Sequence, residues 1–202
     1  VVYSLPELGY SLHVGGRSAL ELQGYAHFHS MQGIRRLHVY GVNKLPRWVD
    51  QKEAPYRLTL HKVGLFDEPV PEAVTTKPFG HWDWPVRYAT PELALLELAA
   101  EVKQAADFGV LDKLFDSATS LRPQLLTKLL MACHHVKAKR LFLWFAERHG
   151  FDWLKQLETR AISLGSGKRL IVKSGTLDKK YLITVPRKMM REDTDGFDES
   201  FL

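Results

Sequence analysis

Nine basic side chains, gathered in four short runs, are the residues of this sequence whose types and spacing most readily suggest chemistry. They are Arg35 and Arg36, then Lys137, Lys139 and Arg140, then Lys168 and Arg169, then Lys179 and Lys180. Such clusters bind phosphate groups or the acidic face of a protein partner. Because no base-reading pattern and no helix-turn-helix is visible within these runs, the sequence leaves open whether they meet nucleic acid or an acidic partner.

The distribution of charge favours a binding surface in the second half of the chain. The 202 residues carry a formal net charge of +5, yet residues 121–190 carry +11, residues 1–120 carry −2 and residues 191–202 carry −4. A surplus of this size indicates a surface for a polyanion or an acidic partner. A solvated helical face is the plainer alternative. The acidic residues of 191–202 could fold back over the basic region or remain mobile.

Two motifs suggest an enzyme and fail on their spacing or context. Gly165-Ser166-Gly167-Lys168 resembles part of a phosphate-binding loop, but Ile162 and Arg169 stand where that loop needs glycine and serine or threonine. Glu101 and Lys103 match the end of a nuclease pattern, but we expect them in the middle of a helix, on a solvated face. A nuclease-like or nucleotide-binding enzyme using either motif is therefore kept only as the alternative, and we expect no catalytic residues.

Histidine and cysteine give no convincing metal site. His27 and His29 alternate along the chain, and Cys133, His134 and His135 are adjacent, but neither group has further ligands at a suitable spacing. Half-buried or surface histidine is the better interpretation. We expect neither a metal nor another cofactor.

The elements that must position these residues are a set of strands, a run of helices and a closing pair of strands. The pattern of apolar residues and turns predicts strands at 12–14, 36–40, 57–63, 73–76, 85–88, 168–173 and 180–185. It predicts helices at 18–24, from Thr90 to about Ala106, and at 109–117, 123–134, 137–149 and 152–158. This order indicates an α+β fold with a mixed sheet, a helical block and a C-terminal hairpin.

Length and composition exclude several classes of protein. No apolar stretch approaches the roughly 18–20 residues that cross a bilayer, so we expect no membrane association. One cysteine among 202 residues excludes a disulfide-stapled scaffold. With no secretion signal visible, the expected compartment is the cytoplasm.

Three regions follow from these patterns. We expect a mixed-sheet subdomain at 1–90, a helical subdomain with the closing hairpin at 91–190, and an acidic tail at 191–202, which together form one domain. Residue 1 is Val rather than Met, and the segment that begins there looks already under way, so we expect the chain to belong to a longer protein.

Several segments together resemble one known family. Residues 13–27 read HVGGRSALELQGYAH, which is similar to the HxGGRTALELQGxAH segment of AbiEi-family antitoxins from bacterial type IV toxin–antitoxin systems. Residues 89–97, ATPELALLE, resemble the family's SxPERALLE helix start, with Leu93 where arginine is frequent. The stretches at 136–142, 166–169 and 180–186 fit its C-terminal pattern.

The resemblance implies a function that the residue patterns alone do not. Members of the family are antitoxins and transcriptional autoregulators involved in abortive infection and phage defence. Their N-terminal winged helix binds repeats in the operon's promoter DNA, and their C-terminal domain neutralises a nucleotidyltransferase toxin. This chain is similar to the C-terminal domain, and we expect the winged helix to lie outside it.

Overall fold

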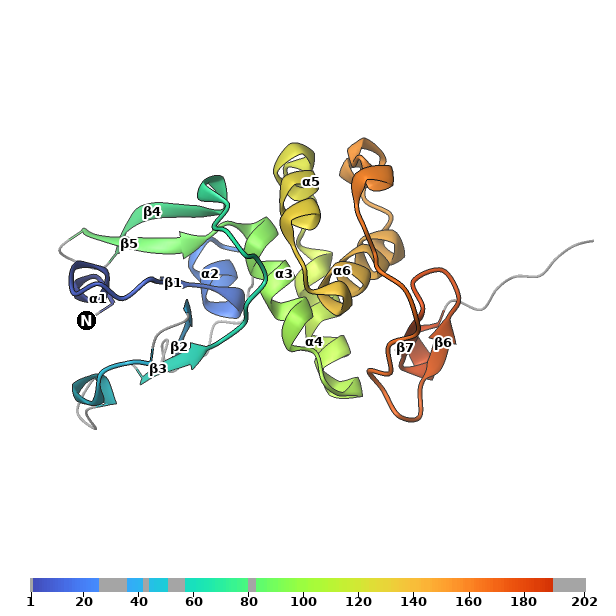
Figure 1. The fold of residues 1–202 in the computed structure, drawn as a ribbon, viewed down its shortest axis with the longest axis horizontal. Helices are drawn as coiled ribbons and strands as arrows, with labels where there is room; N and C mark the ends of the chain where they lie inside the picture. The colour runs from blue at the N-terminus through green and yellow to red at the C-terminus, as the bar shows by residue number, and fades with distance from the viewer. Residues whose placement is uncertain (1, 26–35, 42–43, 51–56, 80–82, 191–202) are drawn as a thin grey trace, which may run out of the picture.

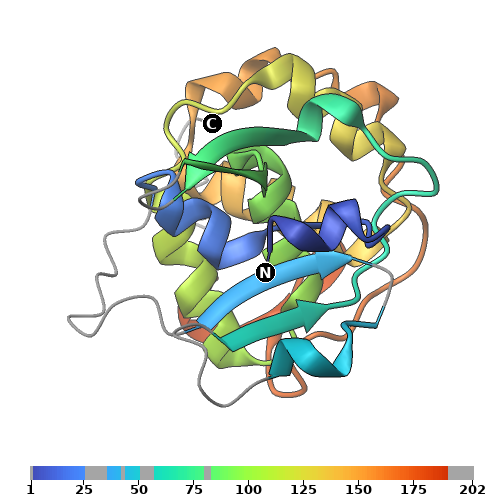
Figure 2. The same cartoon turned by 90° about the vertical axis from the view of Figure 1, so that its left-hand side faces the viewer.

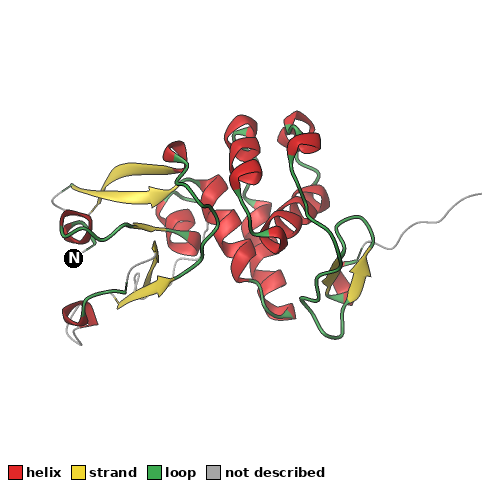
Figure 3. Cartoon of the chain, in the orientation of Figure 1, coloured by secondary structure: helices red, strands yellow, loops and turns green. Residues whose placement is uncertain are grey.

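The computed structural model describes residues 2–25, 36–41, 44–50, 57–79 and 83–190. A mixed sheet, a helical block and a two-stranded hairpin follow one another along the long axis of the molecule (Figures 1 and 3). The expected α+β fold is therefore confirmed. None of the helices in the described ranges is long and apolar enough to span a bilayer.

The N-terminal sheet has five strands in the order β3-β2-β1-β5-β4. Their bounds are β1 Leu12–Val14, β2 Arg36–Gly41, β3 Arg57–His61, β4 Val74–Phe79 and β5 Trp84–Ala89. In the centre of the sheet, β1 pairs antiparallel with β2 and parallel with β5. At the two edges, β3 pairs parallel with β2, and β4 pairs antiparallel with β5. Seen from the sheet side, the strands lie in front of the helical block (Figure 2).

Two helices accompany the sheet. The short helix α1 spans Ser4–Glu7, and α2 spans Gly16–Leu22, two residues earlier than the pattern predicted. The α2 helix packs against both β2 and the next helix, α3. Gly24, which follows α2, has a φ of +81°, a conformation that suits glycine after the end of a helix. The sheet therefore contacts the helical block through α2.

The predicted helix from Thr90 to Ala106 is divided between two helices. Helix α3 spans Pro91–Glu101 and α4 spans Ala105–Asp116. The break arises because Gln104 and Asp107 form a reciprocal capping box, in which the Asp107 carboxylate accepts hydrogen bonds from the Lys103 and Gln104 N–H groups. Such a box starts a new helix, and Ala106 therefore belongs to α4.

Two further helices complete the block, with α5 at Pro123–Ala132 and α6 at Val136–His149. The His135 Nδ1 accepts a hydrogen bond from the Ala138 N–H and caps α6. Gly150 ends α6 in the left-handed conformation at φ +67°, as its position in the sequence predicted. The segment predicted as a helix at 152–158 is a short 3-10 helix, Asp152–Gln156.

The C-terminal hairpin is present, but its strands differ from the predicted ones. Strand β6 spans Thr176–Asp178 and pairs antiparallel with β7 at Ile183–Val185. The predicted strand at 168–173 makes only an isolated parallel bridge, between Arg169 and Ile183. The Thr184 hydroxyl accepts from the Ile171 and Val172 N–H groups, which bends this segment away from the strand direction after Leu170.

The buried apolar residues form two clusters. The larger one joins α2, the helices α3 to α6 and the hairpin, and it includes Leu20, Phe108, Phe142 and Ile183. The smaller one lies on the sheet around Val14, Val39 and Tyr88. Helix α3 is buried on nearly all sides, and its buried residues include two carboxylates, Glu92 and Glu97. A buried charge requires partners, and both carboxylates have them, as shown below.

Candidate functional site: basic surface and histidine–carboxylate joint

The nine basic residues singled out from the sequence do not form one patch. Arg35 lies outside the described residues, and Arg36 is exposed at the start of β2, in the N-terminal sheet. Lys168, Arg169, Lys179 and Lys180 are exposed around the hairpin, which lies at the opposite end of the molecule from the sheet (Figure 1). Lys137, Lys139 and Arg140 lie on α6 between these two regions.

The basic run on α6 is largely buried, which the sequence did not indicate. The Lys137 amine donates a hydrogen bond of 2.8 Å to the Val102 carbonyl at the end of α3. Burial, followed by the charge of Lys103, holds the pKa of Lys137 below its usual value. Lys139 is only 4% exposed. These two lysines therefore face the helical block more than a partner.

Of the three basic side chains on α6, Arg140 makes the most hydrogen bonds within the fold. Its side chain is 2% exposed, and its guanidinium donates to the carbonyls of Leu164 (2.8 Å), Gly167 (2.6 Å) and Gly165 (3.0 Å), with a longer bond of 3.4 Å to Leu182. All four acceptors are main-chain oxygens. Burial and the nearby charge of Arg169 lower the pKa of Arg140. The guanidinium thus holds the loop before the hairpin and is not available as a surface contact.

The Gly165–Lys168 loop is consequently shaped by Arg140. Gly165 and Gly167 have φ values of +62° and +75°, a conformation that glycine adopts at little steric cost. Their carbonyls point to Arg140, and the loop leads into an extended segment rather than into a helix. A phosphate-binding loop needs N–H groups at a helix N-terminus, so this geometry does not support nucleotide binding by the loop.

The remaining basic residues surround the hairpin. The Arg169 N–H donates to the Leu182 carbonyl (2.8 Å), which brings the segment of Lys168 and Arg169 next to the turn that carries Lys179 and Lys180. Lys180 forms an ion pair with Glu147 of α6. Burial, with the charge of Glu147, raises the pKa of the Tyr181 hydroxyl. The hairpin therefore brings together four of the nine predicted residues.

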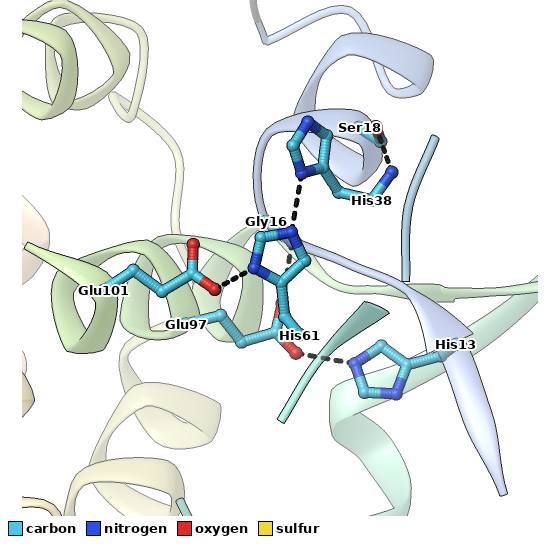
Figure 4. Close-up of polar contacts among 7 residues, drawn as sticks. All are labelled: His13, Gly16, Ser18, His38, His61, Glu97 and Glu101. Atoms are coloured by element: carbon cyan, nitrogen blue, oxygen red, sulfur yellow. Dashed lines mark hydrogen bonds and ion pairs between the residues drawn. The ribbon is translucent and has the colours of Figure 1, made fainter. Parts of the chain in front are cut away.

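A second group of side chains, not recognised in the sequence, links the sheet to α3 (Figure 4). We call this group the joint, and its members are His13, His38, His61, Glu97 and Glu101. The Glu97 carboxylate accepts from the Gly16 N–H (2.7 Å) and lies 2.6 Å from His13 Nε2. One turn further along α3, Glu101 pairs with His61 Nδ1, and His61 Nε2 lies 2.7 Å from His38 Nδ1. Two carboxylates spaced i, i+4 share one helix face, and they meet histidines from β1 and β3.

This arrangement corrects the interpretation of Glu101 and Lys103. Glu101 is the last residue of α3 and Lys103 lies beyond it, so the pair is not in the middle of a helix. Glu97 is buried and Glu101 is three-quarters buried in its ion pair, so these carboxylates do not form a solvated face. The signal in the sequence was the i, i+4 carboxylate pair together with one histidine on each of the strands β1, β2 and β3.

Tyr40 lies at the centre of the joint. Its ring stacks on His61 with a centroid distance of 4.8 Å, and more distantly on His13 at 6.1 Å. Burial, followed by the charges of Glu97 and Glu101, strongly raises the pKa of its hydroxyl. Burial and the neighbouring His61 lower the pKa of His38. The ion pair of Glu101 with His61 and the contact of His61 with His38 thus hold β3 and β2 on α3.

The histidines considered as metal ligands are placed differently. His27 and His29 lie outside the described residues. Cys133 is buried, which raises the pKa of its thiol, while His134 faces Asp67 at 3.5 Å and His135 caps α6. In the part of the chain that the structure describes, no three such side chains are arranged to hold a metal ion.

A hollow of about 900 Å³ opens beside the joint, between the end of β3 and helices α3 and α4. His61 and Glu101 line one side, and Leu98, Val110 and Leu111 supply apolar surface. Its charged groups have both signs, with Lys103 close to Asp107. The hollow therefore shows no preference for a ligand of one charge.

The fold defines an α+β protein in which a small mixed sheet and a hairpin flank a helical block, and comparison with known proteins identifies its class. Residues 35–186 match the family described as "Transcriptional regulator, AbiEi antitoxin, Type IV TA system". The match covers well over half of the chain, and the protein belongs to this family. No curated protein matches the chain.

One solved structure supports the fold independently. The crystal structure of RV2827C protein from Mycobacterium tuberculosis is similar with a TM-score of 0.57 at 14% identity, over 91% of this chain and 65% of that one. At this identity the likeness concerns the fold alone. The present chain spans 65% of the length of that protein.

Proposed function

We propose that this chain is the toxin-neutralising part of an antitoxin that also regulates its own operon. The observation that carries the proposal is the family match over residues 35–186. The matched range contains the helical block and the hairpin, which together hold most of the larger core. The toxin it neutralises is a nucleotidyltransferase, and the chain acts in the cytoplasm without catalysis of its own.

We further propose that the complete protein recognises promoter repeats through a winged helix outside residues 1–202. The exposed basic residues of the hairpin support a role in this complex, either against DNA phosphates or against an acidic face of the toxin. Arg36 is a separate candidate at the sheet end. Lys137, Lys139 and Arg140 are not carried into this surface because their side chains are engaged within the fold.

Co-expression in bacteria tests the antitoxin role. The nucleotidyltransferase encoded in the same operon is induced alone and together with residues 1–202, and growth is followed. We expect growth arrest with the toxin alone and recovery when the chain is present. Continued arrest in the presence of well-expressed, folded chain would contradict the proposal.

A second arm tests whether the effect needs enzyme chemistry. In the variant Lys103→Gln, the lysine of the nuclease-like pair is removed at an exposed position, so folding should be unaffected. We expect recovery of growth to remain complete. Loss of recovery with an unchanged melting curve would favour the enzymatic alternative.

A further inference from the structure

The mixed sheet ends in two edge strands that differ in how well they are protected. At one edge, β4 carries Lys77 and Pro78 within its span, and proline has no N–H to offer another strand. At the other edge, β3 reads RLTLH, with no proline and with its one arginine at the first residue. Because edge strands are usually blocked by lysine, proline or a covering element, β3 is the edge that is open to a further strand (Figure 2).

The main chain of β3 is paired on one side. All of its residues pair parallel with β2, and an edge strand presents the other half of its N–H and C=O groups outward. Within the described ranges, the main chain of residues 57–64 has no hydrogen bond to a turn, loop or cap. The 3-10 helix Arg47–Asp50 contacts β3, but no main-chain hydrogen bond joins the two, and its Val49 packs on the smaller core cluster. The outer side of β3 is therefore available for strand addition.

The hollow beside the joint continues along this edge. Five consecutive residues, 60–64, line one side of it, and the end of α3 with part of α4 lines the other. Successive side chains of a strand point to opposite faces, so a hollow that touches five residues in succession follows the edge of the strand. Its apolar wall and its charges of both signs suit an uncharged, apolar side chain.

The charges along the edge indicate the chemistry of the occupant. Residues 57–64 read RLTLHKVG and contain no acidic residue. Arg57 and Lys62 are exposed, and five positions of extended chain separate them by about 16 Å. Arg36, also exposed, lies next to Arg57 in the register of β2 and β3. An extended segment with carboxylates at this separation complements the edge.

Two carboxylates lie near the edge, and both are engaged within the fold. Glu101 forms its ion pair with His61. The Asp107 carboxylate accepts hydrogen bonds from the N–H groups of Lys103 and Gln104. Neither acidic group is therefore aimed at the cations of the edge.

We propose that β3 accepts an extended segment of a protein partner as an additional strand of the sheet. Carboxylates of the segment lie opposite Arg57 and Lys62, and an apolar side chain between them enters the hollow. In such strand addition the main-chain hydrogen bonds supply affinity, and the pockets for alternate side chains supply specificity. The proposal goes beyond the antitoxin role, since it rests on the edge of β3 and not on the identity of the toxin.

Titration of residues 1–202 with a designed peptide tests the site. The probe is a fluorescein-labelled peptide of alternating threonine and valine, with a central leucine and a glutamate on each side of it. We expect saturable binding by fluorescence anisotropy, together with slower hydrogen exchange in residues 57–64 and unchanged exchange in β4. Absence of saturable binding, or slower exchange elsewhere in place of 57–64, would overturn the proposal.

Two N-methylated forms of the probe test for main-chain pairing. One form is methylated at every second nitrogen, and the other at the nitrogens between them. Only one side of an extended peptide faces β3, so one form should bind more weakly by at least about tenfold and the other should bind like the probe. Equal affinities of the two forms would exclude strand addition.

Charge reversal tests the two cations. The variant Arg57→Glu with Lys62→Glu changes exposed positions, so the melting temperature should stay the same. We expect its affinity for the probe to fall about tenfold at low salt, and its affinity for a probe with lysines in place of the glutamates to rise. Lys77→Glu with Arg87→Glu, exposed on β4 and β5, is the matched control. An equal loss in the control would show that net charge alone is responsible and would contradict the site.

The role of the hollow is tested with Val110, which lines it from α4 and is 47% exposed. Replacing the leucine of the probe by alanine should weaken binding to the wild type several-fold, because less apolar area is buried. In Val110→Trp, whose larger side chain occupies the hollow, the two probes should bind alike. If leucine keeps its full advantage in Val110→Trp, the apolar side chain lies outside the hollow and this assignment is wrong.

Discussion

At the start of α2, two glycines leave room for a tyrosine and a carboxylate. A Cβ atom at Gly16 would overlap the Tyr40 hydroxyl, and one at Gly15 would overlap the Glu97 carboxylate and the Tyr40 ring. Gly16 also has a φ of +49°, which costs a non-glycine residue free energy. Glycine is thus required at both positions because Tyr40 and α3 approach the backbone closely. At Gly16 it is also required by the positive φ.

Comparing a substitution at Gly16 with one at Gly9 separates the cost of the positive φ from the cost of the clash with Tyr40. Gly9 has a φ of +82°, and a Cβ atom added there would meet no other atom within 4 Å, so Gly9→Ala should lower the free energy of unfolding by only about 1 kcal/mol. Gly16→Ala should lower it by about 2–4 kcal/mol, because the clash with Tyr40 is added to the backbone strain. Urea unfolding measures both. Equal losses would show that Tyr40 moves aside without cost.

At the scale of elements, buried carboxylates on α3 connect it to its neighbours. Near the start of α3, Glu92 accepts from the Arg122 N–H (2.9 Å), Nε (3.0 Å) and Nη2 (3.0 Å). Burial alone would raise the pKa of Glu92, but the hydrogen bonds from Arg122 outweigh it and the pKa is lowered. The pair holds the start of α5, where Arg122 precedes Pro123, against the start of α3.

The Glu92 contact should stabilise the fold except in acid. Because the pKa is lower in the folded state, the stabilisation is present above the unfolded value near pH 4.3 and is lost as the pH falls through the folded value. Glu92→Gln should lower the free energy of unfolding by about 1–3 kcal/mol at pH 7, and the difference from wild type should shrink at pH 3. Chemical unfolding at the two pH values checks this. A difference that persists undiminished at pH 3 would exclude a role for the carboxylate charge.

The joint between the sheet and α3 should respond to pH in the range where histidine titrates. The pKa of His38 is lowered by burial and by His61; Glu101 opposes this shift, and the charges of Arg36 and Arg17 add to it. The unfolded chain therefore takes up the proton first, and stability declines as the pH falls below about 6.5.

Replacing His38 should weaken this pH dependence. We expect the melting temperature of His38→Gln to fall less between pH 7.5 and 5.5 than that of the wild type, with a residual slope from His135, whose pKa is also lowered by burial. His134→Gln is the matched control, because His134 is half exposed and outside the joint. If His38→Gln retains the full slope, the joint does not contribute to it.

At the scale of the whole molecule, the positive charges divide into those within the fold and those free to bind. Lys137, Lys139 and Arg140 form the first group, and Lys168, Arg169 and Lys179 form the second. Replacing either group by glutamine removes three charges, so the net charge changes equally. The consequences for stability should nevertheless differ.

The first triple variant should unfold at a lower temperature by roughly 6–12 °C, corresponding to about 3 kcal/mol, because the carbonyls around Arg140 lose their donors. The second should stay within about 1–2 °C of the wild type, since its side chains are exposed. Circular dichroism melting distinguishes them. Similar melting temperatures would mean that the carbonyls around Arg140 are satisfied by another route.

Much of the architecture could be predicted from the sequence, because it depends on local patterns. The alternation of polar and apolar residues predicted strands β2 and β3. Thr90-Pro91-Glu92 predicted the start of α3, and Gly150 predicted the end of α6. The break at Gln104 was missed because a capping box interrupted an otherwise continuous apolar period. The strand predicted at 168–173 was wrong because the Thr184 hydroxyl captures two N–H groups that a ladder would need.

The site was harder to predict, because its residues are distant in sequence. His13 and Glu97 are 84 positions apart, and Arg140 meets carbonyls 24 to 42 residues away. Charge composition indicates that a segment is basic, but only packing determines which side chains remain exposed. The division of the chain at residue 90 stays a prediction, and Ala19 and Leu20 of α2 pack in the same core as the helices.

The way in which Arg140 holds its loop has a consequence for sequence divergence. The guanidinium recognises main-chain oxygens, which every amino acid supplies, so the shape of the loop places little demand on the side chains at Ser166 and Lys168. Substitutions at these two positions should leave the path of the backbone unchanged as long as Gly165, Gly167 and Arg140 are kept. New side chains can therefore be introduced at Ser166 and Lys168 without changing the backbone path that Arg140 holds.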